Sequence, residues 1–178
     1  MCSSDLSHNL SERDRKRVVD LFIIVAIPPR KSLTTDEAKA VIDTFTAEQL
    51  SDAARALSRM QANAGNKSDV QWTEIVGPWF SKAWPKKLAA QNSEVSANLA
   101  WMAIESGNAF PSVVDAIKDR LVPVDQPGFS LHRLKDSELH KRFPLAAKCL
   151  VERIASNPHD VLSGAYEEVM NEIEESLQ

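Results

Sequence analysis

Glycine is scarce in this sequence, which has five glycines among its 178 residues. So few glycines disfavour a glycine-rich phosphate loop, and they also disfavour an all-β fold rich in tight turns. Neither a Walker motif nor the glycine fingerprint of dinucleotide-binding folds occurs. The sequence therefore lacks the common signals of a nucleotide-binding enzyme.

An excess of basic residues is also absent. Lys and Arg number 21 against 25 Asp and Glu, so the formal net charge is −4. Domains that bind nucleic acid usually carry a basic surplus, because they must neutralise phosphates. Any contact with nucleic acid would therefore need a local basic patch.

Cysteines and long apolar runs are few. Cys2 and Cys149 show no metal-ligand spacing and imply no disulfide framework, so a reducing, cytoplasmic setting is expected. The longest apolar run, residues 18–29, is interrupted by Asp20 and is too short to span a bilayer. We predict no cofactor and no membrane partner.

What the sequence does contain is an internal repeat. Phe110-Pro111 and Phe143-Pro144 lie 33 residues apart, and apolar residues follow each phenylalanine at offsets of 3, 4, 7 and 11. These offsets mark one face of an α-helix, and a period of this length is typical of stacked helical pairs. The predicted core positions of the repeat are Phe110, Val114, Ile117, Leu121, Phe143, Leu150 and Ile154.

Helical patterns cover the rest of the chain. Predicted helices begin at Ser11, at Thr34 or Thr35, at Thr46, at Ser68 or Asp69, and at Ser93, and a last one runs from about Asp160 to Ser176. Pro78 is expected to kink or split its helix. In the repeat, each proline is expected at the first helical position, with the preceding phenylalanine extended as N-cap. No convincing strand is found, so we predict an all-α fold, an irregular HEAT- or TPR-like array of antiparallel helical pairs.

The chain divides into three parts by composition. Residues 1–6 match the translation of a sequencing adapter and are interpreted as a non-native leader, the alternative being a polar natural N-terminus. Residues 7–65 form an N-terminal helical part, and residues 66–178 form the helical-repeat part. Residues 18–25 are apolar on nearly every side, which is typical of a helix buried all round. In a truncated fragment one side would lie open where a preceding repeat belongs, so we expect self-association.

Residues 83–150 carry a resemblance to a known group of proteins. The matching elements are Trp84-Pro85-Lys86, the helix of residues 93–103, residues 107–111, Leu121-Val122-Pro123, Leu131-His132-Arg133-Leu134, and Arg142-Phe143-Pro144 with Ala146-Ala147. This segment resembles the C-terminal helical tail, of degenerate HEAT or TPR type, of large bacterial proteins that carry an NTPase or SIR2-like effector domain and are associated with antiphage defence. The resemblance implies a truncated tail whose catalytic domain lies upstream, and it carries over no catalytic residue.

The candidate partner surface combines aromatic and basic side chains. Its members are Trp84, Lys86, Lys87, Arg133, Lys135, Lys141 and Arg142. Trp84 is expected to be partly exposed, because lysines surround it. These residues favour a non-catalytic scaffold or protein-interaction module, whose partner is a protein or the upstream domains of the same chain.

Three alternatives use the histidines and the basic residues. The first is nucleic-acid contact through the segment from His132 to Arg142, although Asp136 and Glu138 dilute its charge. The second is a metal site at His132 and His140, whose spacing does not match a helix-borne histidine pair. The third is a general base at His159, for which the sequence supplies no recognisable nucleophile or orienting partner.

Overall fold

The computed structural model describes residues 11–30, 32–86, 91–155 and 164–178. Within these ranges it contains helices and no β-strand, so the predicted all-α class is confirmed. The predictions for residues 1–6, Lys87, His159 and the start of the last helix at Asp160 lie outside the described residues.

The helices follow one another with short connections. They are α1 (Glu12–Ala26), α2 (Thr35–Ile42), α3 (Ala47–Ala64), α4 (Ser68–Gln71), α5 (Gly77–Ala83), α6 (Ser93–Ile104), α7 (Phe110–Ile117), α8 (Gly128–Asp136), α9 (Leu139–Arg142), α10 (Pro144–Ile154) and α11 (Ala165–Ser176). Short 3₁₀ turns cover Gly65–Lys67, Gly107–Ala109 and Lys118–Arg120.

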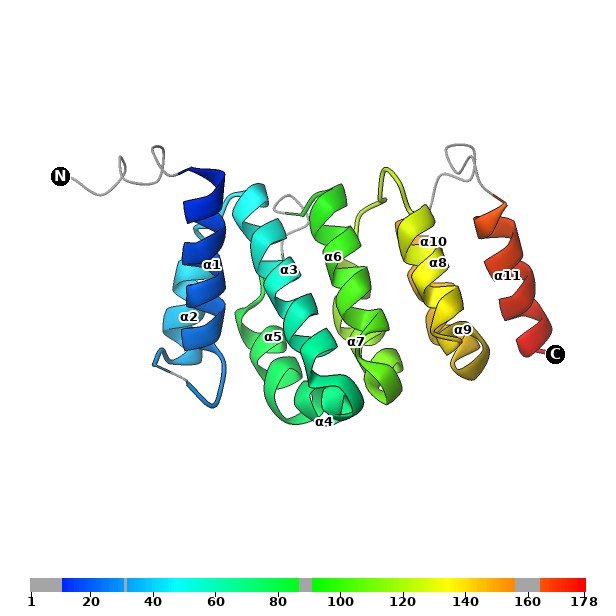
Figure 1. Ribbon diagram of the computed structural model, residues 1–178, viewed down its shortest axis with the longest axis horizontal. Coiled ribbons are helices and arrows are strands. Elements are labelled where there is room, and N and C mark those ends of the chain that lie inside the picture. Colours follow the sequence, from blue (N-terminus) through cyan, green and yellow to red (C-terminus); the bar gives the residue numbers. More distant parts are fainter. Residues whose placement is uncertain (1–10, 31, 87–90, 156–163) are drawn as a thin grey trace.

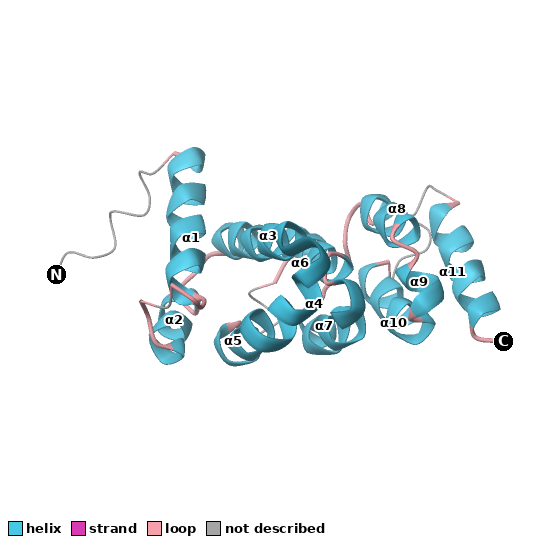
Figure 2. Cartoon of the chain, turned by 60° about the horizontal axis from the view of Figure 1, so that its bottom comes forward, coloured by secondary structure: helices cyan, strands magenta, loops and turns pink. Residues whose placement is uncertain are grey.

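The helices stand in a row of two layers, with the N-terminal and C-terminal ends at opposite ends of the row (Figure 1). One layer contains α1, α3, α6, α8 and α11, and the other contains α2, α5, α7 and α10 (Figure 2). Contacts run from each helix to its neighbour within a layer, as between α3 and α6 or between α7 and α10. This arrangement is compatible with a helical repeat array, and the assignment to the HEAT or TPR type stays a prediction.

Several helix starts follow directly from their capping residues. Thr34 and Thr46 each accept a hydrogen bond from the backbone N–H three residues on, and the residue at that position bonds back to the cap. Such capping boxes satisfy backbone donors that would otherwise lack partners. The starts of α2 and α3 are therefore determined locally and could be predicted from the sequence.

The densest packing joins α3 to α6, across the predicted boundary between residues 65 and 66. Small buried side chains on both helices let them lie close together: Ala53, Ala54, Ala100 and Ala103. Two polar contacts also join α3 to α6 and to the turn that follows α6. Ser58 Oγ donates to the carbonyl oxygen of Asn98 at 2.6 Å, and Gln61 Nε2 donates to Ser106 Oγ at 2.9 Å. The helices before and after residue 65 thus share one core.

Pro78 neither breaks its helix nor leaves it regular. The turn before it, Trp72–Val76, is a π-helix, and the backbone N–H of Gly77 donates to the carbonyl oxygen of Trp72. A wider turn accommodates a proline, which has no N–H to donate and crowds the preceding turn. A Cβ atom on Gly77 would lie 2.9 Å from the same carbonyl oxygen, so this position requires glycine.

The two repeat segments fold into helices, but they begin differently. Phe143 is the N-cap of α10, whereas Phe110 has helical torsions (φ −43°, ψ −49°) and is the first residue of α7. The prediction of an extended N-cap is therefore wrong for Phe110, and Phe143 caps α10 with φ −135° and ψ 61°, which lies outside the extended region. A 3₁₀ turn leads straight into α7, and Gly107 (φ 55°) supplies the left-handed residue that starts it.

Candidate interaction surface

The aromatic member of the predicted partner surface lies in the core. Trp84 is only 1% exposed, and its ring stacks on that of Phe80 with centroids 5.1 Å apart. The prediction of partial exposure is therefore wrong. Helix α5 ends at Ala83, and the extended backbone of Trp84 turns the indole back over the residue four positions earlier. Lys86 is exposed beside it.

The basic residues Lys135 and Lys141 converge on one carboxylate of the last helix. The Glu172 side chain of α11 lies 3.5 Å from Lys135 Nζ and 3.1 Å from Lys141 Nζ. His140, which is fully buried, places Nε2 2.9 Å from a Glu172 oxygen and Nδ1 3.2 Å from the carbonyl oxygen of Leu134. We call Lys135, His140, Lys141 and Glu172 the Glu172 network, and it joins α8, α9 and α11.

The Glu172 network shifts the pKa values of Glu172 and Lys135. The hydrogen bond from His140, followed by that from Lys141, lowers the pKa of Glu172 to about 2. Lys135 also pairs with Glu168, and this contact raises the pKa of the lysine. Two positive charges of the predicted surface are thus already neutralised within the chain, and a phosphate would have to compete with these carboxylates.

Arg133 has a different environment, in the angle between α6 and α8. Its guanidinium lies over the rings of Trp101 and Phe129, at 5.3 and 5.7 Å from their centroids. It also pairs with Glu105, which accepts a hydrogen bond from Trp101 Nε1 at 3.0 Å. Both aromatic rings and the carboxylate therefore fix the position of the guanidinium. We call these four residues the Arg133 cluster.

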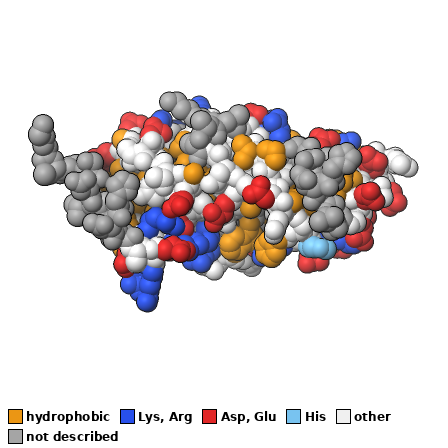
Figure 3. Space-filling model, turned by 90° about the horizontal axis from the view of Figure 1, so that it is seen from above, with side chains coloured by type: hydrophobic (Ala, Val, Ile, Leu, Met, Phe, Trp, Pro, Cys, Tyr) orange, Lys and Arg blue, Asp and Glu red, His pale blue; other side chains and the backbone are white. Residues whose placement is uncertain are grey.

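One ring of the Arg133 cluster is open to solvent. Phe129 is 68% exposed, although large aromatic side chains are usually covered. In the space-filling view, hydrophobic side chains gather along the lower edge beside a histidine, while acidic side chains crowd the end of the molecule that carries α11 (Figure 3). The Arg133 cluster thus combines exposed apolar area with a pre-positioned cation.

The remaining predicted residue, Arg142, belongs to neither group. It donates to Asn108 Oδ1 and lies over the ring of Phe143, 5.2 Å from its centroid. The predicted surface is consequently not a single patch, because its described members lie at separate places: Trp84 in the core with Lys86 exposed beside it, Lys135 and Lys141 in the Glu172 network, Arg133 in its own cluster, and Arg142 at the end of α9.

Sequence reasoning missed three members of the Arg133 cluster. Phe129 and Arg133 are four residues apart on α8, and Trp101 of α6 is four residues before Glu105, the C-cap of that helix, so each pair shares a helix face. This spacing was a usable signal. That the two pairs face each other could be learned only from the packing of α6 against α8.

The described ranges contain no group of three or more side chains placed to hold a metal ion. His132 is exposed, whereas His140 is engaged by Leu134 and Glu172, so the two predicted ligands do not meet. In the part of the chain that the structure describes, every helix is too short or too polar to cross a lipid bilayer.

The chain is similar to a curated protein, the uncharacterised protein y4cA of Sinorhizobium fredii. The two are 31% identical over 94 residues, which cover 52% of this chain and 8% of that protein. The chain therefore spans less than a tenth of the length of this relative. No protein-family profile and no solved structure matches the chain.

Proposed function

We propose that this chain is a non-catalytic protein-interaction module that binds a partner through the Arg133 cluster. The observation that carries the proposal is the exposed ring of Phe129, packed on a guanidinium that Trp101 and Glu105 hold in place. Covering an exposed aromatic ring stabilises a complex through the hydrophobic effect. Arginine and tryptophan are also frequent among residues that dominate binding energy.

The fixed geometry of the cluster supports this role. An arginine that is already ordered loses little side-chain entropy when a partner binds, whereas a free arginine would lose much more. Glu105 limits the net charge of the cluster, which favours a partner with an apolar or aromatic side chain over a strongly charged one.

We place the module within a longer cytoplasmic protein of bacterial defence or signalling, whose catalytic domain lies upstream. The resemblance of residues 83–150 to the tails of such proteins supports this placement. The great length of the y4cA relative is compatible with it.

The test is affinity capture from a nuclease-treated bacterial lysate with matched baits. We expect the Phe129→Ala and Arg133→Ala baits each to recover at least about tenfold less of a partner than the wild-type bait does. A tenfold loss of affinity corresponds to about 1.4 kcal/mol, which is in the range expected for a residue that dominates binding. Leu145→Ala is the matched control, because Leu145 is 73% exposed and lies on α10. If every captured protein binds all four baits equally, the Arg133 cluster is not the interface.

The alternative is nucleic-acid contact through the segment from His132 to Arg142. It predicts salt-dependent binding of a DNA or RNA oligonucleotide that Lys141→Glu abolishes and Phe129→Ala leaves intact. Fluorescence anisotropy over a salt series measures this directly, and such a result would replace the proposal above.

A further inference from the structure

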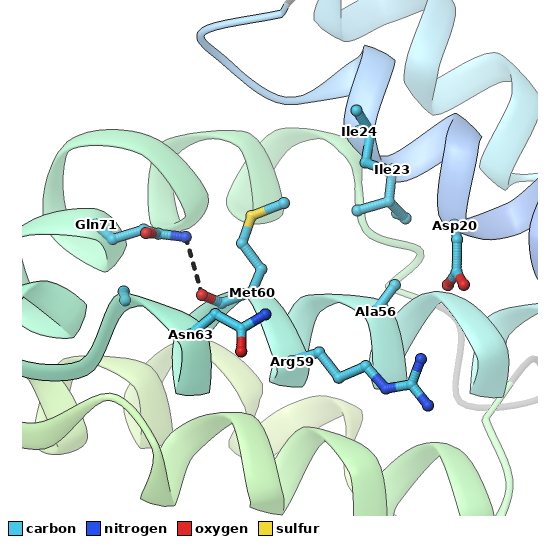
Figure 4. Close-up of a pocket in the computed structure, with 9 residues that line it drawn as sticks. Asp20, Ile23, Ile24, Ala56, Arg59, Met60, Asn63 and Gln71 are labelled. Atoms are coloured by element: carbon cyan, nitrogen blue, oxygen red, sulfur yellow. Dashed lines mark hydrogen bonds between the residues drawn. The ribbon is translucent and has the colours of Figure 1, made fainter.

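Two ionisable side chains near opposite ends of the row contain polar atoms that are shielded from solvent, and their surroundings differ. Asp20 Oδ1, in a groove of about 450 Å³ between α1 and α3, makes no hydrogen bond within the described residues (Figure 4). His140 is fully buried, and each of its ring nitrogens faces an oxygen atom. Nδ1 lies 3.2 Å from the carbonyl oxygen of Leu134, and Nε2 lies 2.9 Å from a carboxylate oxygen of Glu172. These two oxygens decide which form of the His140 ring fits.

Neither oxygen that faces His140 can donate a hydrogen bond. A carbonyl oxygen offers only lone pairs, and Glu172 is ionised at neutral pH, as carboxylates beside lysines are. A neutral imidazole carries one N–H and one nitrogen lone pair. In either neutral tautomer, a nitrogen lone pair of His140 would therefore face the lone pairs of an oxygen. Only the doubly protonated ring donates to both.

The end of α8 gives a second reason for a charged ring. Leu134 lies in the last turn of α8, and the backbone N–H of Glu138, four residues on, donates to Lys135 instead. The carbonyl oxygen of Leu134 is thus left for side chains, and it accepts from Ser137 Oγ at 2.8 Å as well as from His140. The C-terminal end of a helix carries partial negative charge, which favours a cation.

The other charged side chains around the ring offset one another. Each lysine on the helices packed around His140 pairs with a carboxylate of α11: Lys135 with Glu168, Lys141 with Glu172, and Lys148 with Glu174. Repulsion between these lysines and a charged ring is therefore reduced. Burial disfavours a charge, but the cost is smallest where every N–H of the charged group is bonded, as it is for a doubly protonated His140.

We infer that His140 is a doubly protonated imidazolium in the folded protein at neutral pH, and that it acts as a pH-sensitive clasp for α11. The carbonyl belongs to α8, the ring to α9 and the carboxylate to α11, so one charged ring links three helices. When the pH rises and the ring loses a proton, one of its two hydrogen bonds must be lost. Helix α11 should then open more often. This inference goes beyond the proposed function and does not rest on it.

The small buried face of α11 makes it sensitive to this clasp. Its buried residues are Ala165, Val169 and Ile173, and its last turn contains no basic residue to complement the helix dipole. Elements with few buried apolar contacts open at low free energy, well below the energy of global unfolding. One charged hydrogen bond can therefore change how often α11 opens while the rest of the array stays folded.

Nitrogen-15 NMR of the imidazole rings tests the protonation state directly in the wild type. An ordinary histidine has a pKa of about 6.5 and is mostly neutral at pH 7.5. We expect both nitrogens of His140 to be protonated at that pH. The variants His140→Gln and His132→Gln assign the signals, since each removes one ring. A His140 ring with one protonated and one unprotonated nitrogen at pH 7.5 overturns the inference.

Hydrogen exchange of the α11 amides tests the clasp. At pH 7.5, His140→Gln should lower their protection factors by at least about tenfold, because its neutral side chain cannot replace both charged hydrogen bonds. His132→Gln, at an exposed histidine of α8, should leave them unchanged. As the pH rises from about 7.5 to about 9.5, the protection of α11 in the wild type should fall toward that of His140→Gln, since deprotonation of the ring releases the same bond.

Two exchange results would also overturn the inference. One is equal protection of α11 in His140→Gln and His132→Gln, and the other is a wild-type advantage over His140→Gln that stays constant across this pH range. Circular dichroism confirms that each variant is folded. Phe129→Ala should show the same His140 signals as the wild type, which separates this result from the proposed function.

Discussion

Residues 110–121 and residues 143–154 have matching apolar patterns, but their surroundings differ. Phe110 is fully buried inside a helix, whereas Phe143 is a half-buried N-cap with Arg142 over its ring. The rings of Phe110 and Phe143 pack together at 6.3 Å, since α7 and α10 are neighbours in one layer. A repeated pattern therefore specifies repeated helices, while position in the row decides how deeply each residue is buried.

The shared endings of the two repeats show the same divergence. Arg120 lies over the ring of Phe80 at 5.2 Å, and burial lowers its pKa. Its counterpart Arg153 is exposed and approaches Asp119 of the first repeat at 3.7 Å. One arginine thus contributes to packing, whereas the other makes a surface ion pair.

The largest expected difference between the repeats concerns their phenylalanines. Phe110→Ala should lower the free energy of unfolding by about 3 to 5 kcal/mol, because it leaves a cavity in the core. Phe143→Ala should lower it by about 1 to 2 kcal/mol, since the ring is only half-buried. Urea denaturation followed by tryptophan fluorescence measures both. Equal losses would show that the two repeats are energetically equivalent.

A second difference is the Glu172 network, whose ion pairs and hydrogen bonds join the helices next to the second repeat. Glu172→Gln should destabilise the protein at neutral pH by about 1.5 to 2 kcal/mol, because hydrogen bonds to charged groups are strong. Since the folded pKa of Glu172 is about 2 and its ordinary value is 4.5, this contribution is full above pH 4.5 and is lost as the pH falls toward 2.

The measurement for Glu172 is the melting temperature over a pH series. The melting temperature of the wild type should exceed that of Glu172→Gln at neutral pH, and this difference should disappear as the pH falls toward 2. Glu167→Gln is the control, because Glu167 is exposed on the same helix and makes no ion pair within the described residues. A gap between wild type and Glu172→Gln that stays constant from neutral pH down to acid would contradict the assignment.

The two arginines at the shared ending, Arg120 and Arg153, should differ less in their contributions to the free energy of unfolding. Arg120→Ala should cost about 1 kcal/mol, through the loss of its contact with Phe80 and of its hydrogen bond to the carbonyl oxygen of Ala116. Arg153→Ala should change stability by less than about 0.5 kcal/mol, as is usual for exposed ion pairs. Chemical denaturation of the two variants in parallel measures both changes. Equal losses of stability would show that the two arginines contribute alike.

The last comparison concerns the turns that precede the two repeats, where the expected effects are again small. Glu138 joins α8 to α9 with a left-handed backbone (φ 55°), which glycine adopts without strain. Glu138→Gly should therefore stabilise the protein by about 0.5 to 1 kcal/mol. Gly107 has the same φ in the turn before the first repeat, so Gly107→Ala should have the opposite effect and destabilise the protein. Thermal melts of both variants provide the comparison, and a loss of stability in Glu138→Gly would refute it.

Much of the fold could be predicted because its causes are local. Capping threonines at residues 34 and 46, apolar spacing along each helix and the scarcity of glycine all act within a few residues. The candidate surface was predicted poorly, because it depends on which helix faces meet.

The sequence by itself determined that the chain is helical, where most helices begin and which residues of the repeat helices are buried, apart from Phe143, which is only half-buried. Helical periodicity and capping are short-range effects, which is why they could be predicted. Only the tertiary structure decided that Trp84 is buried, that Glu172 gathers Lys135, His140 and Lys141, and that Arg133 lies between Trp101 and Phe129. The physical reason is that charge pairing and exposure depend on contacts between helices far apart in the chain. Those contacts arise from the packing of whole helix faces, which no local pattern specifies.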